Sequence, residues 1–179
     1  MKLSEINWAA FSKSVETVLV YFLQKVRAME PTHHLYVFGT DSHTYDALIN
    51  PIANSLETLE AVALQKFPAR PKETSFRVLK WDPDYWKFQY YCDHNDPFEV
   101  NTLGDFWEML SQLELEDDEL ERRNLDFRRA VVRALITVKS TPEFQALPKT
   151  ENFALRYYEN EDLIFKSQEE MEVFLKESE

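Results

Sequence analysis

The sequence contains very little cysteine and very little glycine. Cys92 is the only cysteine among 179 residues, so no disulfide can form within the chain. Gly39 and Gly104 are the only glycines. Dinucleotide-binding and P-loop sites hold phosphate in loops that need several glycines at fixed spacing. We therefore expect neither kind of nucleotide site, and no bound cofactor.

Long apolar runs are also missing. Lys, Arg, Glu or Gln interrupts every stretch before it reaches the roughly 20 apolar residues that span a bilayer. The first residues, MKLSEINWAAF, lack the basic start and continuous apolar segment of a secretory signal. The sequence predicts a cytoplasmic protein without a membrane partner.

Basic residues are too few to balance the acidic ones. Lys and Arg number 20 and Asp and Glu number 32, which gives a net charge of -12. Phosphate backbones are bound mainly by Lys and Arg, so this charge disfavours nucleic acid as a partner. It favours a basic protein partner, although high net charge also serves solubility alone.

Hydrophobic patterning predicts a mixture of helices and strands. Spacings of three and four predict a long helix over 4–30, ended by Pro31, and Ser55, Thr102 and Ser167 are candidate N-caps of later helices. Alternation predicts strands at 34–40, 45–52, 75–81, 88–91, 153–158 and 163–166. This order predicts a single α+β domain over 1–179, with a small, mainly antiparallel sheet packed against the N-terminal and further helices.

An aromatic cluster lies in the stretch KWDPDYWKFQYYCDHNDPF, from Lys80 to Phe98. Pro83 should end the strand before it, and Asp82 can cap the resulting turn. Burial of both tryptophans in the core is one interpretation. The other is a partly exposed surface that binds a partner, since Trp and Tyr are enriched at binding hot spots. On that interpretation the contact residues are Trp81, Asp82, Tyr85, Trp86 and Tyr91.

Two acidic segments are candidate docking surfaces. In the first, acids over 114–121 precede several arginines, a pattern that also suits an exposed helix with ion pairs to Asp126. The second is the segment 159–179, which holds eight acids and two lysines, a net charge of 2 - 8 = -6. Because local helix stabilisation does not require so much charge, Glu169, Glu170 and Glu172 are the preferred contacts for a basic partner.

Catalytic and metal chemistry find weaker support. The groups His33, His34, Asp41 and His43, and Asp93, His94 and Asp96, do not match the spacing of zinc ligands, so no metal site is predicted. Carboxylate pairs are common in so acidic a chain, and a catalytic carboxyl needs a raised pKa. A hydrolase or metal-dependent enzyme with a carboxylate and histidine site near 82–96, built on Asp82, Asp84, Asp93, His94 and Asp96, remains the alternative.

Two short motifs carry a family resemblance. The segments PIANSLE at 51–57 and KWDPDYW at 80–86 resemble the bacterial family known as domain of unknown function 4303. The resemblance implies one α+β domain and no assigned catalytic residues. Some members of that family sit beside polymorphic toxin genes, which implies an immunity role. We therefore expect an acidic protein-binding module, an immunity protein for a basic toxin domain, and leave its oligomeric state open.

Overall fold

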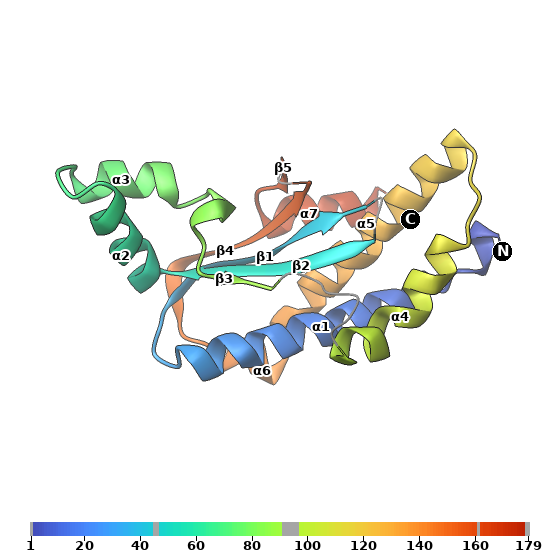
Figure 1. Cartoon of the computed structure of the whole chain (residues 1–179), viewed down its shortest axis with the longest axis horizontal. Helices are drawn as coiled ribbons and strands as arrows, with labels where there is room; N and C mark the ends of the chain where they lie inside the picture. Colours follow the sequence, from blue (N-terminus) through green and yellow to red (C-terminus); the bar gives the residue numbers. More distant parts are fainter. Residues whose placement is uncertain (1, 45–46, 91–96, 161, 178–179) are drawn as a thin grey trace.

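The computed structural model describes residues 2–44, 47–90, 97–160 and 162–177 (Figure 1). Its strands are β1 (Leu35–His43), β2 (Leu48–Ser55), β3 (Phe88–Gln89), β4 (Lys149–Glu159) and β5 (Asp162–Phe165). Its α-helices are α1 (Trp8–Met29), α2 (Leu56–Lys66), α3 (Lys72–Leu79), α4 (Pro97–Ser111), α5 (Asp117–Thr137), α6 (Pro142–Gln145) and α7 (Gln168–Lys176). Single 3-10 turns occur at Leu3–Glu5, Pro83–Tyr85 and Val138–Ser140.

The strands form one sheet in the order β3-β2-β1-β4-β5. Neighbouring strands are antiparallel except β1 and β4, which run parallel at the centre. A Cβ at Gly39 of β1 would lie only 2.2 Å from the carbonyl oxygen of Arg156 in β4, so glycine permits their close approach. The predicted α+β domain with a mainly antiparallel sheet is confirmed, and the parallel central pair is an addition to it.

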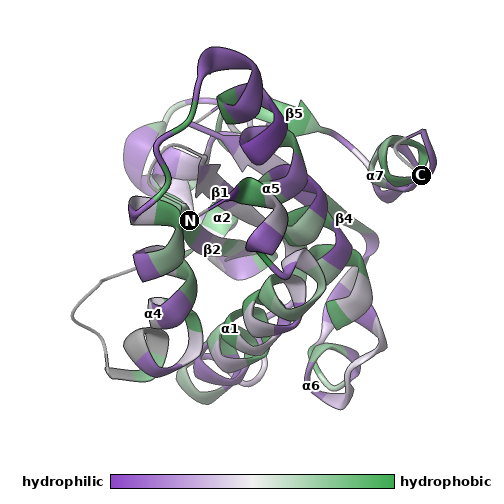
Figure 2. Cartoon of the chain, turned by 90° about the vertical axis from the view of Figure 1, so that its right-hand side faces the viewer, coloured by the Kyte–Doolittle hydropathy of each residue, from purple (hydrophilic) through white to green (hydrophobic). Residues whose placement is uncertain are grey.

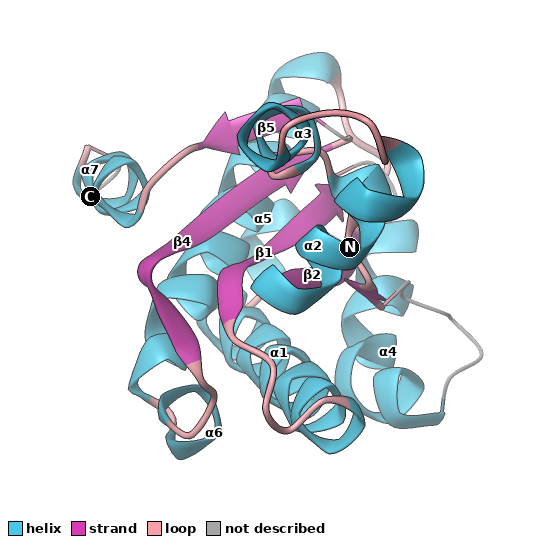
Figure 3. Cartoon of the chain, turned by 90° about the vertical axis from the view of Figure 1, so that its left-hand side faces the viewer, coloured by secondary structure: helices cyan, strands magenta, loops and turns pink. Residues whose placement is uncertain are grey.

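Helices cover both faces of the sheet. The larger core lies between the sheet and α1, α4 and α5, and a smaller one lies between its other face and α2 and α3 (Figure 1). Helix α7 lies beyond the β4 side of the sheet (Figures 2 and 3), where it contacts α5, β4 and β5. The sheet therefore separates the α2–α3 hairpin from the long helices.

The long N-terminal helix follows from its apolar spacing. The Asn7 side chain caps α1 by accepting the Ala10 N–H at 3.0 Å, and the chain leaves the helix just before Pro31. Phe11, Val15 and Leu19 recur every four residues and are fully buried. Burying each such side chain stabilises the fold by about 1.5 to 3 kcal/mol. The predicted helix is confirmed, although it begins at Trp8 and not at Ser4.

The strand predicted at 75–81 is wrong, because residues 75–79 belong to α3 and Lys80 and Trp81 form the turn after it. Ser75 and Leu79, four residues apart, are its buried side chains, as expected for one face of a helix. The third strand is instead β3, which pairs Phe88 with Ala53 and Gln89 with Ile52. The predicted strand at 88–91 is thus confirmed only for two residues.

Two of the three candidate helix caps are correct. Ser55 accepts the Thr58 N–H at 3.1 Å, and Ser167 accepts the Glu170 N–H at 3.2 Å. Thr102 is not a cap, because it lies inside α4 and its hydroxyl donates to the Phe98 carbonyl at 2.7 Å. Of the helices in the described part of the chain, none has the length and apolar character needed to cross a membrane.

Candidate functional site

Trp81 is the exposed member of the predicted aromatic cluster. It follows α3, and Asp82 caps the next turn by accepting the Asp84 N–H at 3.1 Å, as the sequence predicted. The Trp81 side chain remains 37% exposed. Its ring lies 4.6 Å from the Lys80 ammonium and 4.5 Å from the Arg156 guanidinium. These cation–π contacts hold a large aromatic surface next to solvent.

Trp86 belongs to the core and not to the surface. It is only 4% exposed, and its ring meets Tyr158 edge to face at 5.7 Å. The Tyr158 hydroxyl donates to the Trp81 carbonyl at 3.1 Å, which ties the turn to β4. Tyr85 is partly buried against the same smaller core, and Tyr91 lies outside the described residues. A partner could therefore reach Trp81 but not Trp86.

Helix α7 presents the acidic residues predicted from the C-terminal segment. The Glu170 carboxylate accepts the Lys166 N–H at 2.6 Å, one residue before the N-cap Ser167. Hydrogen bonds at the start of α7, from its own backbone N–H and from Ser167, lower the pKa of Glu169. Glu172 accepts a hydrogen bond from Gln168. Glu169 and Glu170 are exposed carboxylates, whereas Glu172 is partly buried.

A groove of about 580 Å³ lies between β5 and α7. We call it the α7–β5 groove; its lining residues are Ile164, Phe165, Lys166, Glu169, Glu170, Val173, Phe174 and Glu177. Val173 is 50% exposed, and Phe165 and Phe174 pack together at 5.0 Å between ring centroids. The groove thus joins exposed apolar side chains to a carboxylate rim, an arrangement typical of protein–protein interfaces.

Arg156 of β4 interacts with residues of both regions that the sequence predicted as separate candidates. Its guanidinium stacks on Trp81. Burial lowers the pKa of Arg156, and the charges of Tyr158 and Glu170 oppose this effect. Glu170 is therefore close enough to Arg156 to act on it electrostatically. Arg156 thus contacts Trp81, which is far from it in sequence, and also feels the charge of Glu170 in α7.

Besides the Trp81 region and the α7–β5 groove, the structure contains a cluster of polar side chains that was not predicted from the sequence. Arg128 of α5 donates to both carboxylate oxygens of Glu159, at 2.7 and 2.9 Å, and the Tyr157 hydroxyl donates to Glu159 at 3.3 Å. Hydrogen bonding to Glu159 raises the pKa of Arg128. Because Glu159 lies two residues after Tyr157, continuing the strand alternation of 153–158 would have predicted its burial. By its charge alone, Glu159 is only one of the eight acids of the segment 159–179.

A cleft of about 660 Å³ opens beside this ion pair at the carboxyl ends of β1 and β4. Its lining residues are Thr44, Asp118, Glu121, Arg122, Asn124, Leu125, Arg128, Glu159 and Asn160. Arg123, which is buried next to it, donates to the Thr44 carbonyl at 2.6 Å. The Arg128–Glu159 pair joins the end of β4 to α5, and each of its two charges is neutralised by the other within the protein.

Only part of the carboxylate and histidine site of the alternative enzyme hypothesis lies among the described residues. Its residues Asp93, His94 and Asp96 lie outside the described part of the chain, and Asp82 is engaged in capping. The other histidine group is dispersed, because each histidine contacts a different side chain: His33 contacts Ser55, His34 contacts Glu57 and His43 contacts Asp41. Within the described residues, no three His, Cys, Asp or Glu side chains are grouped to hold a metal ion.

Comparison with protein families gives one match. The family model described as Domain of unknown function (DUF4303) matches residues 16–169. The match includes both motifs, at 51–57 and 80–86, as well as β4, β5 and the start of α7. No curated protein and no solved structure matches the chain.

Proposed function

Because the chain belongs to the family described as Domain of unknown function (DUF4303), we propose a function from its surface: it is a cytoplasmic protein-binding module for a basic partner. The partner occupies the α7–β5 groove and reaches Trp81. We propose further that this partner is a toxin domain that the module neutralises, as the implied immunity role of the family would require. The apolar groove with its carboxylate rim is the observation that carries the proposal.

The groove supplies both parts that a protein interface needs. Exposed Ile164 and Val173 offer apolar surface, whose burial provides affinity. Glu169, Glu170 and Glu177 surround them and complement Lys or Arg side chains. Glu169 is an exposed carboxylate whose pKa is lowered by hydrogen bonds at the start of α7, so it is ionised at neutral pH as an ordinary glutamate is. The partner that fits this groove therefore has a basic surface with an apolar side chain at its centre.

Charge also guides the encounter. The net charge of -12 attracts a basic protein over long distances and raises its association rate at low salt. Screening by salt weakens this attraction, because the Debye length falls to about 8 Å at physiological ionic strength. Binding by the proposed surface should therefore weaken as salt rises. Covering a basic surface of a toxin would also block its access to an anionic substrate, which explains how binding would neutralise it.

The test uses two valines that are matched in type, helix setting and exposure. Val173 in α7 is 50% exposed and lies in the groove, whereas Val78 in α3 is 48% exposed and lies outside it. The tagged protein is used to capture partners from its native cell, with elution by a salt gradient and identification by mass spectrometry. A basic partner captured by the wild type is then measured by titration calorimetry against Val173→Lys and Val78→Lys.

We expect Val173→Lys to weaken binding at least tenfold, because it places a cation in the groove, and Val78→Lys to bind as the wild type does. Affinity should also fall with added salt. Equal effects of the two substitutions, or the absence of any saturable partner at low salt, would contradict the proposed surface. For the immunity role, co-expression with the partner should restore growth that the partner alone arrests, and Val173→Lys should lose this protection.

A further inference from the structure

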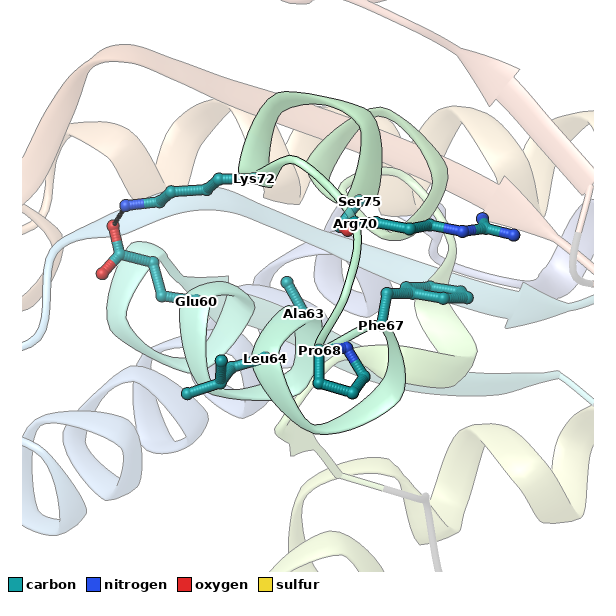
Figure 4. A pocket seen from close by; sticks show the side chains of 8 residues that line it. All are labelled: Glu60, Ala63, Leu64, Phe67, Pro68, Arg70, Lys72 and Ser75. Carbon is teal, nitrogen blue, oxygen red and sulfur yellow. Dashed lines mark hydrogen bonds and ion pairs between the residues drawn. The ribbon is translucent and has the colours of Figure 1, made fainter.

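A third concave site lies between α2 and α3 (Figure 4). We call it the α2–α3 pocket; its lining residues are Glu60, Ala63, Leu64, Phe67, Pro68, Arg70, Lys72 and Ser75. Its volume is about 260 Å³. This is near the lower end of the range of small-molecule sites, which begins at roughly 300 Å³. The pocket is thus of a size for a small ligand and not for a large cofactor.

The wall that α2 contributes is apolar. Ala63 and Leu64 project from α2, and Phe67 and Pro68, which directly follow the helix, continue this surface (Figure 4). Leu64 is 71% exposed, the largest exposed fraction among the exposed large apolar side chains of the described residues. An apolar ligand group placed here would remove Leu64 from water, which is favourable in proportion to the area covered.

The charge around the pocket is opposite to that of the whole chain. The segment 56–80 contains five basic residues and three acidic ones, a net charge of 5 - 3 = +2, although the chain as a whole carries -12. The basic residues are Lys66, Arg70, Lys72, Arg77 and Lys80. A site in this segment therefore favours an anion, unlike the carboxylate rim of the α7–β5 groove.

Arg70 is the cation best placed to hold that anion. Its guanidinium lies 4.6 Å from the Phe67 ring at one side of the pocket, and the Lys72–Glu60 ion pair lies at the other (Figure 4). Lys72 is thus already neutralised, whereas no ion pair joins Arg70 to a carboxylate of the described residues. A guanidinium held flat on an aromatic ring keeps its N–H groups free for a carboxylate, which it can bind through two hydrogen bonds.

We propose that the α2–α3 pocket binds a small monocarboxylate with a short aliphatic chain. Arg70 binds the carboxylate, and Ala63, Leu64 and Phe67 contact the chain. A single negative charge matches Arg70, which among the two cations that line the pocket is the one without an ion pair to a carboxylate of the described residues. The apolar wall excludes a fully hydrated polyanion such as phosphate. This site is independent of the proposed partner surface, because the two share no residue.

The probe is hexanoate, titrated into the isotopically labelled protein and followed by two-dimensional amide NMR. Hexanol tests the aliphatic chain without the charge, and acetate tests the charge without the chain. We expect hexanoate to shift signals of α2 and α3 saturably, with a dissociation constant on the order of 1 mM. Hexanol and acetate should each bind at least tenfold more weakly. Shifts that do not saturate, or that map outside α2 and α3, would overturn the proposal.

Two arginine variants separate recognition from general electrostatics. Arg70→Gln removes the guanidinium in the pocket, and Arg77→Gln removes an exposed charge of α3 that does not line it. Both lower the local charge equally, so screening affects both alike. We expect Arg70→Gln to weaken hexanoate binding at least tenfold, with hexanol binding unchanged, and Arg77→Gln to bind hexanoate as the wild type does. Equal affinity of the two variants would show that Arg70 does not hold the carboxylate.

Discussion

At the scale of single residues, the Arg128–Glu159 pair combines bidentate geometry with a buried carboxylate, and such charge-assisted pairs are strong. We predict that Arg128→Ala lowers the free energy of unfolding by about 3 kcal/mol, since it leaves a buried carboxylate without its cation. The measurement is urea denaturation at neutral pH. Double substitution with Glu159→Gln should recover part of this loss, because no buried charge then remains.

Arg122 provides the matched control on the same helix. Its side chain is largely exposed, and its contact with Asp126 is 4.0 Å long. Arg122→Ala should change the free energy of unfolding by no more than about 0.5 kcal/mol, as is usual for exposed positions. A loss for Arg128→Ala that does not exceed that for Arg122→Ala would show that the buried pair adds no net stability.

The two tryptophans show what residue identity leaves undetermined. Both lie in the motif KWDPDYW, yet Trp86 packs on Tyr158 while Trp81 stays partly exposed between two cations. The sequence was compatible with burial and with exposure of the two tryptophans, and it did not indicate that one would be buried and the other exposed. Arg156 decides the position of Trp81, and it comes from β4, 75 residues later in the chain. Contacts at such sequence separation depend on strand order, which local patterns do not encode.

At the scale of elements, α3 differs from the long helices in how little of it is buried. Only Ser75 and Leu79 of α3 are buried, whereas α1 buries eight residues. We predict that α3 opens locally without global unfolding, because few apolar contacts hold it. In amide hydrogen exchange, its hydrogen-bonded amides should exchange at least about tenfold faster than those at the centre of α1. Equal protection of both helices would mean that α3 opens only with the whole fold.

Secondary structure was predictable wherever the pattern was long. Over 22 residues of α1, the spacing of three and four excludes a strand, and Pro31 marks the end, whereas the predicted start at Ser4 lies four residues before the start at Trp8. The segment SFRVLKW is too short for its apolar spacing to exclude a strand. Its alternating apolar and polar residues fit a strand as well as a helix. Packing against α2 decides in favour of the helix. The parallel pairing of β1 with β4 was likewise not predictable, because more than 100 residues separate them.

At the scale of the whole molecule, charge is distributed unevenly over the fold. The segment 159–179 carries -6 and the segment 56–80 carries +2, and the sheet order places α2–α3 and α7 in different parts of the structure (Figure 3). An acidic groove for a protein and a basic pocket for an anion can therefore coexist. Composition alone predicts only the overall acidity, since the local reversal of charge depends on which segment folds around a pocket.

Three buried tyrosines join the sheet to its surroundings and should make the stability of the whole fold sensitive to high pH. The Tyr36 hydroxyl donates to the Lys80 carbonyl at 2.9 Å, and those of Tyr157 and Tyr158 donate to Glu159 and to the Trp81 carbonyl. Burial raises the pKa of Tyr158 to about 12 and raises the pKa values of Tyr36 and Tyr157 as well. In the unfolded chain a tyrosine has a pKa of about 10.

These tyrosines stabilise the fold fully below about pH 10, where both states keep the phenol protons. As pH rises above that value, the unfolded chain releases protons that the folded protein retains, so the free energy of unfolding falls. Each tyrosine contributes a loss of about 1.4 kcal/mol per pH unit until its folded pKa is reached. We predict that urea denaturation at increasing pH shows this decline and that Tyr158→Phe reduces its slope between about pH 10 and pH 12. Since the substitution also removes the hydrogen bond to Trp81, the slopes and not the absolute stabilities are compared. An unchanged slope in Tyr158→Phe would show that this phenol titrates alike in the folded and unfolded states.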